Sequence, residues 1–333
     1  MPGKSCQKMK KKLSLIFVAF MIVCSLCACT SESRENVAAN DGIRIVTTIF
    51  PEYDWVMNVL GENPAGAEVV MLAGNGVDLH SFQPSVDDIL KISTCDLFIY
   101  VGGESDEWVK DALAEAANKD MEVIDMMDVL AGSVKEEEIV EGMEEEENED
   151  REEGPEYDEH VWLSLRNASV LVQSISESLQ KIDPVNAENY RKNTAAYIEK
   201  LNSLDEEYKK TTANASLHAI LFGDRFPFRY LVDDYGLDYY AAFAGCSAET
   251  EADFETIMFL SQKVDELGLP AVLTIEGTDH RIAETIIGNT KEKNQQILTM
   301  DSMQGTTSGD VQNGTTYLSV MESNLSVLKK SLK

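Results

Sequence analysis

Hydrophobic positions along this chain form two runs, in each of which short β-branched segments alternate with amphipathic segments. The expected strands are residues 43–49, 68–72 and 97–101 in the first run and 219–222, 271–275 and 296–300 in the second. The expected helices are 55–60, 85–92, 254–267, 282–290 and 316–332. Strands that alternate with helices form parallel sheets. The sequence therefore predicts an α/β protein with two parallel-sheet lobes.

Between the two runs, residues 184–211 begin with a proline and contain good helix formers without an internal Gly or Pro. They predict one continuous helix that would span about 40 Å. We expect this rigid helix to join an N-terminal lobe, 42–183, to a C-terminal lobe, 212–333. Ligand-contacting residues should then lie in the cleft between the lobes, on loops that follow the carboxyl ends of strands.

The start of the chain is typical of an export signal. Residues 1–28 carry five lysines and no acid, and they include an apolar run too short for a confident membrane span. The last residues of the run resemble a bacterial lipobox, which predicts a lipid-modified Cys29 followed by a polar tether, 29–41. The alternative is ordinary cleavage of a cysteine-rich signal. The protein is therefore expected outside the cytoplasmic membrane, anchored to it by lipid.

Charge narrows the possible partners. The chain has 28 Lys and Arg against 59 Asp and Glu, a formal net charge of −31. Such a surface repels phosphate backbones, which excludes nucleic acid as the expected partner and favours cations. Residues 136–159 hold 15 of the acids. They predict a flexible acidic insert that either concentrates cations or is simply a solvated coil.

Two cysteines remain after the signal and the proposed lipid site are set aside. Cys95 leads into an expected strand and is expected to be buried, while Cys246 lies in a Gly-Cys-Ser loop. Nothing in their spacing supports a bridge, so we expect two free thiols.

Two of the four histidines indicate a metal site. His80 and His160 each lie in a loop before a helix, and acidic residues directly precede His160. Neutral imidazole is the commonest transition-metal ligand, and a neighbouring carboxylate fixes its tautomer. For His80 the alternative is a structural ring packed on Phe82. A hydrolytic metal centre is a second possible function, although no His-Glu-x-x-His pair or nucleophile elbow is present.

Three motifs in this order resemble those of the zinc- and manganese-binding solute-binding lipoproteins of bacterial metal ABC importers (cluster A-I). They are 78–84 (DLHSFQP), 102–108 (GGESDEW) and 158–163 (DEHVWL). The resemblance covers 42–333. It implies a C-clamp of two α/β lobes joined by a rigid helix, which binds one divalent metal ion. It also implies a monomer that delivers the ion to a permease driven by an ATPase, without catalysis.

The resemblance also implies ligands. His80 and His160 match the two histidine ligands of the N-terminal lobe, and Asp301 matches an aspartate after the last strand of the sheet. His218 precedes its strand, at the opposite end from the cleft, and is expected to be structural.

The family takes a further ligand, a histidine or a glutamate, from a loop of the C-terminal lobe, and here the histidine is missing. Gly223 or Arg225 stands in its place. Asp224 is then the candidate ligand, with an ion pair to Arg225 as the alternative. Glu276 is expected to support the site. His280 could replace the lost histidine, although solvent exposure is the competing expectation.

Imidazole and carboxylate donors suit Zn²⁺ and Mn²⁺ alike. Zinc is expected first, because zinc-binding relatives carry a histidine- and acid-rich insert at the position of 136–159, although this insert has no histidine. Protons compete for the imidazoles, so affinity should fall on acidification. An adhesive surface lipoprotein is a third possible function, which would need no tightly bound metal.

Overall fold

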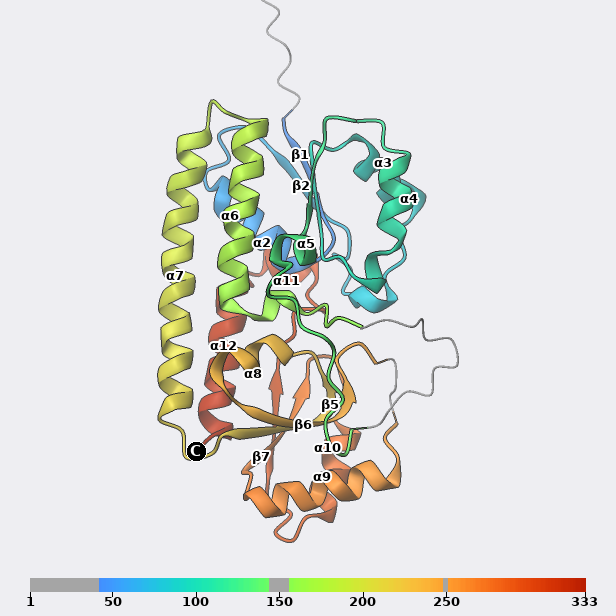
Figure 1. Cartoon of the computed structure of the whole chain (residues 1–333), viewed down its shortest axis with the longest axis vertical. Helices are drawn as coiled ribbons and strands as arrows, with labels where there is room; N and C mark the ends of the chain where they lie inside the picture. The colour runs from blue at the N-terminus through green and yellow to red at the C-terminus, as the bar shows by residue number, and fades with distance from the viewer. Residues whose placement is uncertain (1–41, 144–155, 248–250) are drawn as a thin grey trace, which may run out of the picture. The chain divides into compact units, whose positions relative to one another are not determined.

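The structure is a computed structural model that describes residues 42–143, 156–247 and 251–333. Gly42–Lys333 form one compact unit with two parallel sheets (Figure 1). The first sheet has the order β2-β1-β3-β4 and the second has the order β6-β5-β7-β8. The strands are β1 (Arg44–Thr47), β2 (Glu68–Met71), β3 (Leu97–Tyr100), β4 (Glu122–Asp125), β5 (Ala219–Phe226), β6 (Asp238–Ala244), β7 (Ala271–Ile275) and β8 (Gln296–Met300). The predicted fold class is confirmed.

Helices connect these strands and cover the sheets. The α-helices are α2 (Phe50–Leu60), α3 (Val86–Thr94), α4 (Trp108–Ala114), α5 (Met126–Leu130), α6 (Leu165–Ile182), α7 (Ala187–Ala213), α8 (Arg229–Tyr235), α9 (Phe254–Leu267), α10 (Arg281–Asn289), α11 (Ser308–Gln312) and α12 (Tyr317–Ser331). The 3₁₀ turns are η1 (Leu79–Ser81), η2 (Glu104–Asp106) and η3 (Val161–Leu163).

The long helix α7 begins three residues later than predicted. Asp183 accepts hydrogen bonds from the amide of Asn186 and the hydroxyl of Tyr190, both at 2.7 Å. These bonds hold a separate turn that contains Pro184, and α7 starts only after it. The helix packs on α6 and α2 near its start and on α8 and α12 further along, so it contacts elements of both lobes (Figure 1).

A continuous hydrophobic core joins the two sheets. It runs from Ile45 in β1 to Leu332 at the end of α12. The fully buried Trp162 lies in this core, and its indole N–H donates to the carbonyl of Ser302 at 2.9 Å. The hydroxyl of Tyr317 donates to the carbonyl of Trp162 at 2.7 Å. These bonds connect the segment after His160 to the C-terminal lobe.

Several predictions fall outside the described residues. The signal, the proposed lipid site at Cys29 and the tether lie in 1–41, and the middle of the acidic insert lies in 144–155. None of the described helices combines the length and the apolar character that crossing a membrane requires. The lobe boundaries stay predictions. Cys95 and Cys246 are free thiols, as predicted.

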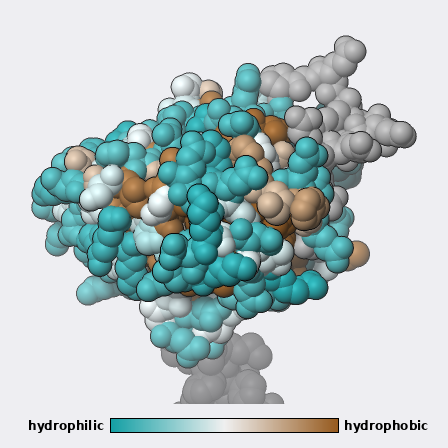
Figure 2. Space-filling model, turned by 90° about the horizontal axis from the view of Figure 1, so that it is seen from below, coloured by the Kyte–Doolittle hydropathy of each residue, from teal (hydrophilic) through white to brown (hydrophobic). Residues whose placement is uncertain are grey.

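One face of the surface is largely polar. The face shown in Figure 2 is covered mainly by hydrophilic side chains, and smaller hydrophobic groups appear between them.

Candidate metal site

The two predicted histidines meet between the loops that carry them. His80 lies in η1, where the carboxylate of Asp78 accepts the backbone N–H of His80 at 3.0 Å. His160 directly precedes η3 and is fully buried. Their Nε2 atoms are 3.2 Å apart. The structure therefore brings together two imidazoles that are 80 residues apart in the sequence.

Polar partners on the other ring nitrogens orient both imidazoles. Nδ1 of His160 lies 3.0 Å from a carboxylate oxygen of Asp158, which can only accept, so Nδ1 carries the proton. Nδ1 of His80 lies 2.8 Å from the hydroxyl of Ser105 and 3.5 Å from the carboxylate of Glu159. With the proton on Nδ1, the lone pair of each Nε2 is free for a metal ion.

The separation of the two Nε2 atoms suits a single ion. Two nitrogens that are each about 2.05 Å from a tetrahedral zinc ion lie roughly 3.4 Å apart. The observed 3.2 Å is close to that value. His80 and His160 can therefore bind one ion without a large movement of either ring.

A third side chain completes a group that the sequence did not predict. The sulfur of Cys246 and the donor nitrogens of His80 and His160 all lie within 4.8 Å of one another. Cys246 follows β6, an edge strand that the hydrophobic pattern did not reveal. Had β6 been recognised, the rule that sites lie after the carboxyl ends of parallel strands would have identified Cys246.

Gly245 allows this close approach. A Cβ atom at this position would lie 2.9 Å from the carbonyl oxygen of Phe226 and 3.0 Å from Cε1 of His160. The lack of a side chain therefore lets the end of β6 pack directly against the imidazole of His160.

Burial and nearby carboxylates set the protonation of the two rings. Burial, aided by the neighbouring His160, lowers the pKa of His80 to about 4, so this ring is neutral at physiological pH. Burial also lowers the pKa of His160, but the charge and hydrogen bond of Asp158 outweigh it and the net shift is upward. Burial and the nearby Asp158 raise the pKa of the Cys246 thiol. Asp158 and Glu159 thus place negative charge beside the two rings, which favours the binding of a cation.

Asp301 and Glu276 lie together outside this group. Glu276 accepts hydrogen bonds from the backbone N–H and the hydroxyl of Ser302, both at 2.7 Å. Asp301 accepts the N–H of Met303 at 2.8 Å. Burial and the charge of Glu276 raise the pKa of Asp301 to about 6.

Asp224 accepts hydrogen bonds from its neighbours in the C-terminal lobe. Its carboxylate accepts the N–H groups of Arg225 at 2.9 Å and Ile275 at 3.1 Å, and the hydroxyl of Thr278 at 2.8 Å. These bonds connect the ends of β5 and β7. The Arg225 guanidinium pairs with Asp78 at 2.8 Å instead of the expected Asp224.

The position expected for the missing histidine has little space. A Cβ atom at Gly223 would lie 2.7 Å from Cα of Ala283 in α10. His280 precedes α10 and His218 precedes β5, where it is exposed. Neither belongs to the three-residue group around His80.

A cavity of about 520 Å³ adjoins the group. Asp78 and Ser81 line it on the side of His80, and Ser247 lines it on the side of Cys246. Arg225 and His280 line it as well. None of the three grouped side chains lines it.

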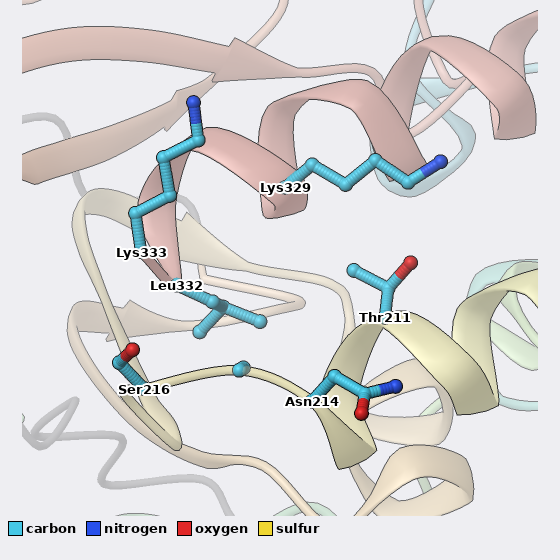
Figure 3. A pocket seen from close by; sticks show the side chains of 7 residues that line it. Thr211, Asn214, Ser216, Lys329, Leu332 and Lys333 are labelled. Carbon is cyan, nitrogen blue, oxygen red and sulfur yellow. The ribbon is translucent and has the colours of Figure 1, made fainter.

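A separate cavity of about 380 Å³ lies at the ends of α7 and α12 (Figure 3). Thr211, Asn214 and Leu332 line it, and the amino groups of Lys329 and Lys333 point in different directions. It contains none of the candidate ligands and has no convergent charge, so we assign it no function.

Known proteins resemble this chain over most of its length. The family model described as zinc-uptake complex component A, periplasmic (ZnuA), matches residues 45–331. The chain is 33% identical over 329 residues to the zinc-binding lipoprotein AdcA of Streptococcus pneumoniae R6, which covers 96% of this chain and 61% of AdcA. It is 28% identical over 330 residues to the high-affinity zinc uptake system protein ZnuA of Bacillus subtilis, covering 97% and 99%.

A solved structure shows the same fold. The crystal structure of Zn(II)-bound AdcA from Streptococcus pneumoniae matches with a TM-score of 0.68 and 29% identity, over 87% of this chain and 58% of that chain. This chain therefore spans about three fifths of the length of the streptococcal relatives.

Proposed function

The chain belongs to the family of periplasmic zinc-uptake components A, and on this premise we propose that it captures one divalent transition-metal ion and delivers it to an ABC importer. The observation that carries the proposal is the 3.2 Å approach of Nε2 of His80 to Nε2 of His160. This separation is close to that of two nitrogens bound to the same tetrahedral zinc ion.

The buried setting supports this function. Asp158 accepts the Nδ1–H of His160, and the Ser105 hydroxyl lies 2.8 Å from Nδ1 of His80, so the other ring nitrogen of each imidazole has a partner that fixes the direction of the ring. Capture and release need no bond to be made or broken in the cargo, so the proposal includes no catalytic step.

Zinc is the proposed cargo. AdcA and ZnuA are named for zinc, and the matched AdcA structure is described as Zn(II)-bound. Manganese remains the alternative, since imidazoles and carboxylates bind both ions.

Among the carboxylates, Asp301 is the proposed oxygen ligand of the C-terminal lobe. Glu276 is proposed to support it by holding the Ser302 backbone in place. The hydrogen bonds of Asp224 favour a structural role for that side chain. His280 lines the cavity and is proposed to contact ions that enter it.

Competition with a zinc chelator on the full-length chain tests the proposal. We expect His80→Ala and His160→Ala each to weaken zinc binding at least about 100-fold, because each removes one of few ligands. The matched control is His218→Ala, which changes an exposed histidine and should bind zinc like the wild type. Unchanged affinity in both site variants, with circular dichroism showing that they fold, would contradict the assignment.

Delivery is proposed to involve a lipid anchor at Cys29, outside the cytoplasmic membrane, and docking of the monomer on a permease and its ATPase. A zinc ABC permease reconstituted with its ATPase in lipid nanodiscs provides the test. Zinc-loaded protein should stimulate ATP hydrolysis more than metal-free protein does. Equal rates would argue against the importer role while leaving metal binding intact.

A further inference from the structure

We propose that Cys246 binds the same ion as His80 and His160 through its sulfur, and that this thiolate makes the site select zinc over manganese. The inference rests on the proposed function, because it concerns a third ligand of that site. It begins from the placement of Cys246, whose sulfur lies within 4.8 Å of the donor nitrogens of both histidines.

The backbone around Cys246 is held on both sides. Its own N–H donates to the carboxylate of Glu137 at 3.3 Å. The guanidinium of Arg225 donates to the carbonyl of Ser247 at 3.4 Å and pairs with Asp78 in the His80 loop. Arg225 therefore connects the loop that carries Cys246 to the loop that carries His80. These contacts hold the backbone of Cys246 and Ser247 next to the two rings.

Cys95 shows what a structural cysteine looks like in this chain. Its thiol contacts the carbonyl of Ile92 and the sulfur of Met121, both at 3.2 Å, and it is completely buried. Its surroundings are apolar, with Val46 and Phe98 in the same cluster. Cys246 instead faces two imidazoles. The two cysteines therefore form a natural pair of test and control.

A sulfur ligand changes which metal ion the site prefers. Thiolates are soft ligands that favour zinc, whereas manganese favours carboxylate, carbonyl and water oxygens. Zinc is bound in proteins by both imidazole nitrogen and thiolate sulfur, and a site with three protein ligands leaves a fourth position for water or a carboxylate. Cys246 thereby supplies the third ligand that Gly223 cannot, because Gly223 carries no side chain.

Cobalt(II) substitution tests the sulfur ligand directly. The full-length chain loaded with one Co²⁺ should show a sulfur-to-cobalt charge-transfer band in the near ultraviolet. The band should disappear in Cys246→Ser, which still binds Co²⁺ through the histidines, and persist in Cys95→Ser. The spectrum of the wild-type protein carries the test even if one variant folds poorly.

Competition between zinc and manganese tests the selectivity. We expect the preference for zinc to fall at least about tenfold in Cys246→Ser, because a hydroxyl is a harder ligand than a thiolate. The preference should be unchanged in Cys95→Ser.

The outcomes separate the two claims. One bound Co²⁺ without the band, or with a band that persists in Cys246→Ser, would overturn the thiolate ligand and leave the metal-binding function standing. No bound metal in the wild-type chain would overturn both.

Discussion

At the scale of single residues, the site depends on partners that never touch the ion. Asp158 accepts both the ring Nδ1–H of His160 and its backbone N–H, at 3.0 Å and 2.8 Å. One carboxylate thus fixes the position and the tautomer of a fully buried ligand.

Asp158→Asn should weaken zinc binding by about 10- to 100-fold, because the amide keeps the shape but removes the negative charge behind the imidazole. Chelator competition measures the change. The exposed Asp111→Asn in α4 is the matched control and should bind zinc normally. Equal affinities of these two variants would contradict the role of Asp158.

The sequence predicted the two histidines of the site but not Cys246. His80 and His160 were predicted because each lies in a polar loop next to a recognisable helix or strand, and their resemblance to a known family supplied the pairing. Cys246 was missed because β6, the strand that places it near His160, does not show in the hydrophobic pattern. Cys246 and His160 are 86 positions apart in the sequence, so without that strand nothing connects them.

At the scale of elements, the interior strands were predictable and two edge strands were not. β4 has four residues, two of them acidic, and β6 contains three alanines, which have low strand propensity. Both lie at the edges of their sheets. Their pairing with a neighbouring strand, rather than their own composition, makes them strands.

The end of β6 provides a test at this scale. Gly245→Ala would place a methyl group 2.9 Å from a backbone oxygen and 3.0 Å from His160, so the loop or the ring must move. We expect zinc affinity to fall at least about tenfold and stability to fall by about 1–3 kcal/mol. Gly288→Ala, where no atom lies within 4 Å of the added carbon, should leave zinc binding unchanged.

We expect the contact between α2 and α7 to depend on pH. Asp54 in α2 is buried and accepts the hydroxyl of Tyr197 in α7 at 3.1 Å. Burial raises the pKa of Asp54 from 3.8 to about 6. The folded chain therefore prefers Asp54 in its protonated form. Protonation of Asp54 stabilises the fold fully below about pH 4, and this stabilisation is lost as the pH rises through about 6.

Asp54→Asn should remove that dependence, because the amide does not ionise. Above about pH 7 the variant should be more stable than the wild type by up to about 3 kcal/mol, and below about pH 4 the difference should vanish. Urea unfolding at several pH values measures it. The exposed Asp87→Asn in α3 is the control. A difference that does not change with pH would contradict the shifted pKa.

At the scale of the whole molecule, one core joins both lobes, so we expect Gly42–Lys333 to unfold in a single transition. A metal ion that binds only the folded chain stabilises it by about 4 kcal/mol at a thousandfold excess over the dissociation constant. Calorimetry should therefore show one transition that moves to higher temperature with zinc. Two separate transitions, or no shift, would contradict this description.

The central claim is that this chain binds one zinc ion through His80 and His160. Native mass spectrometry of the full-length protein, stripped with a chelator and then offered zinc and manganese together, tests it most directly. We expect one zinc per chain in the wild type and a large loss of bound zinc in His80→Ala and in His160→Ala. A wild-type chain that takes up manganese in preference to zinc, or no metal at all, would contradict it.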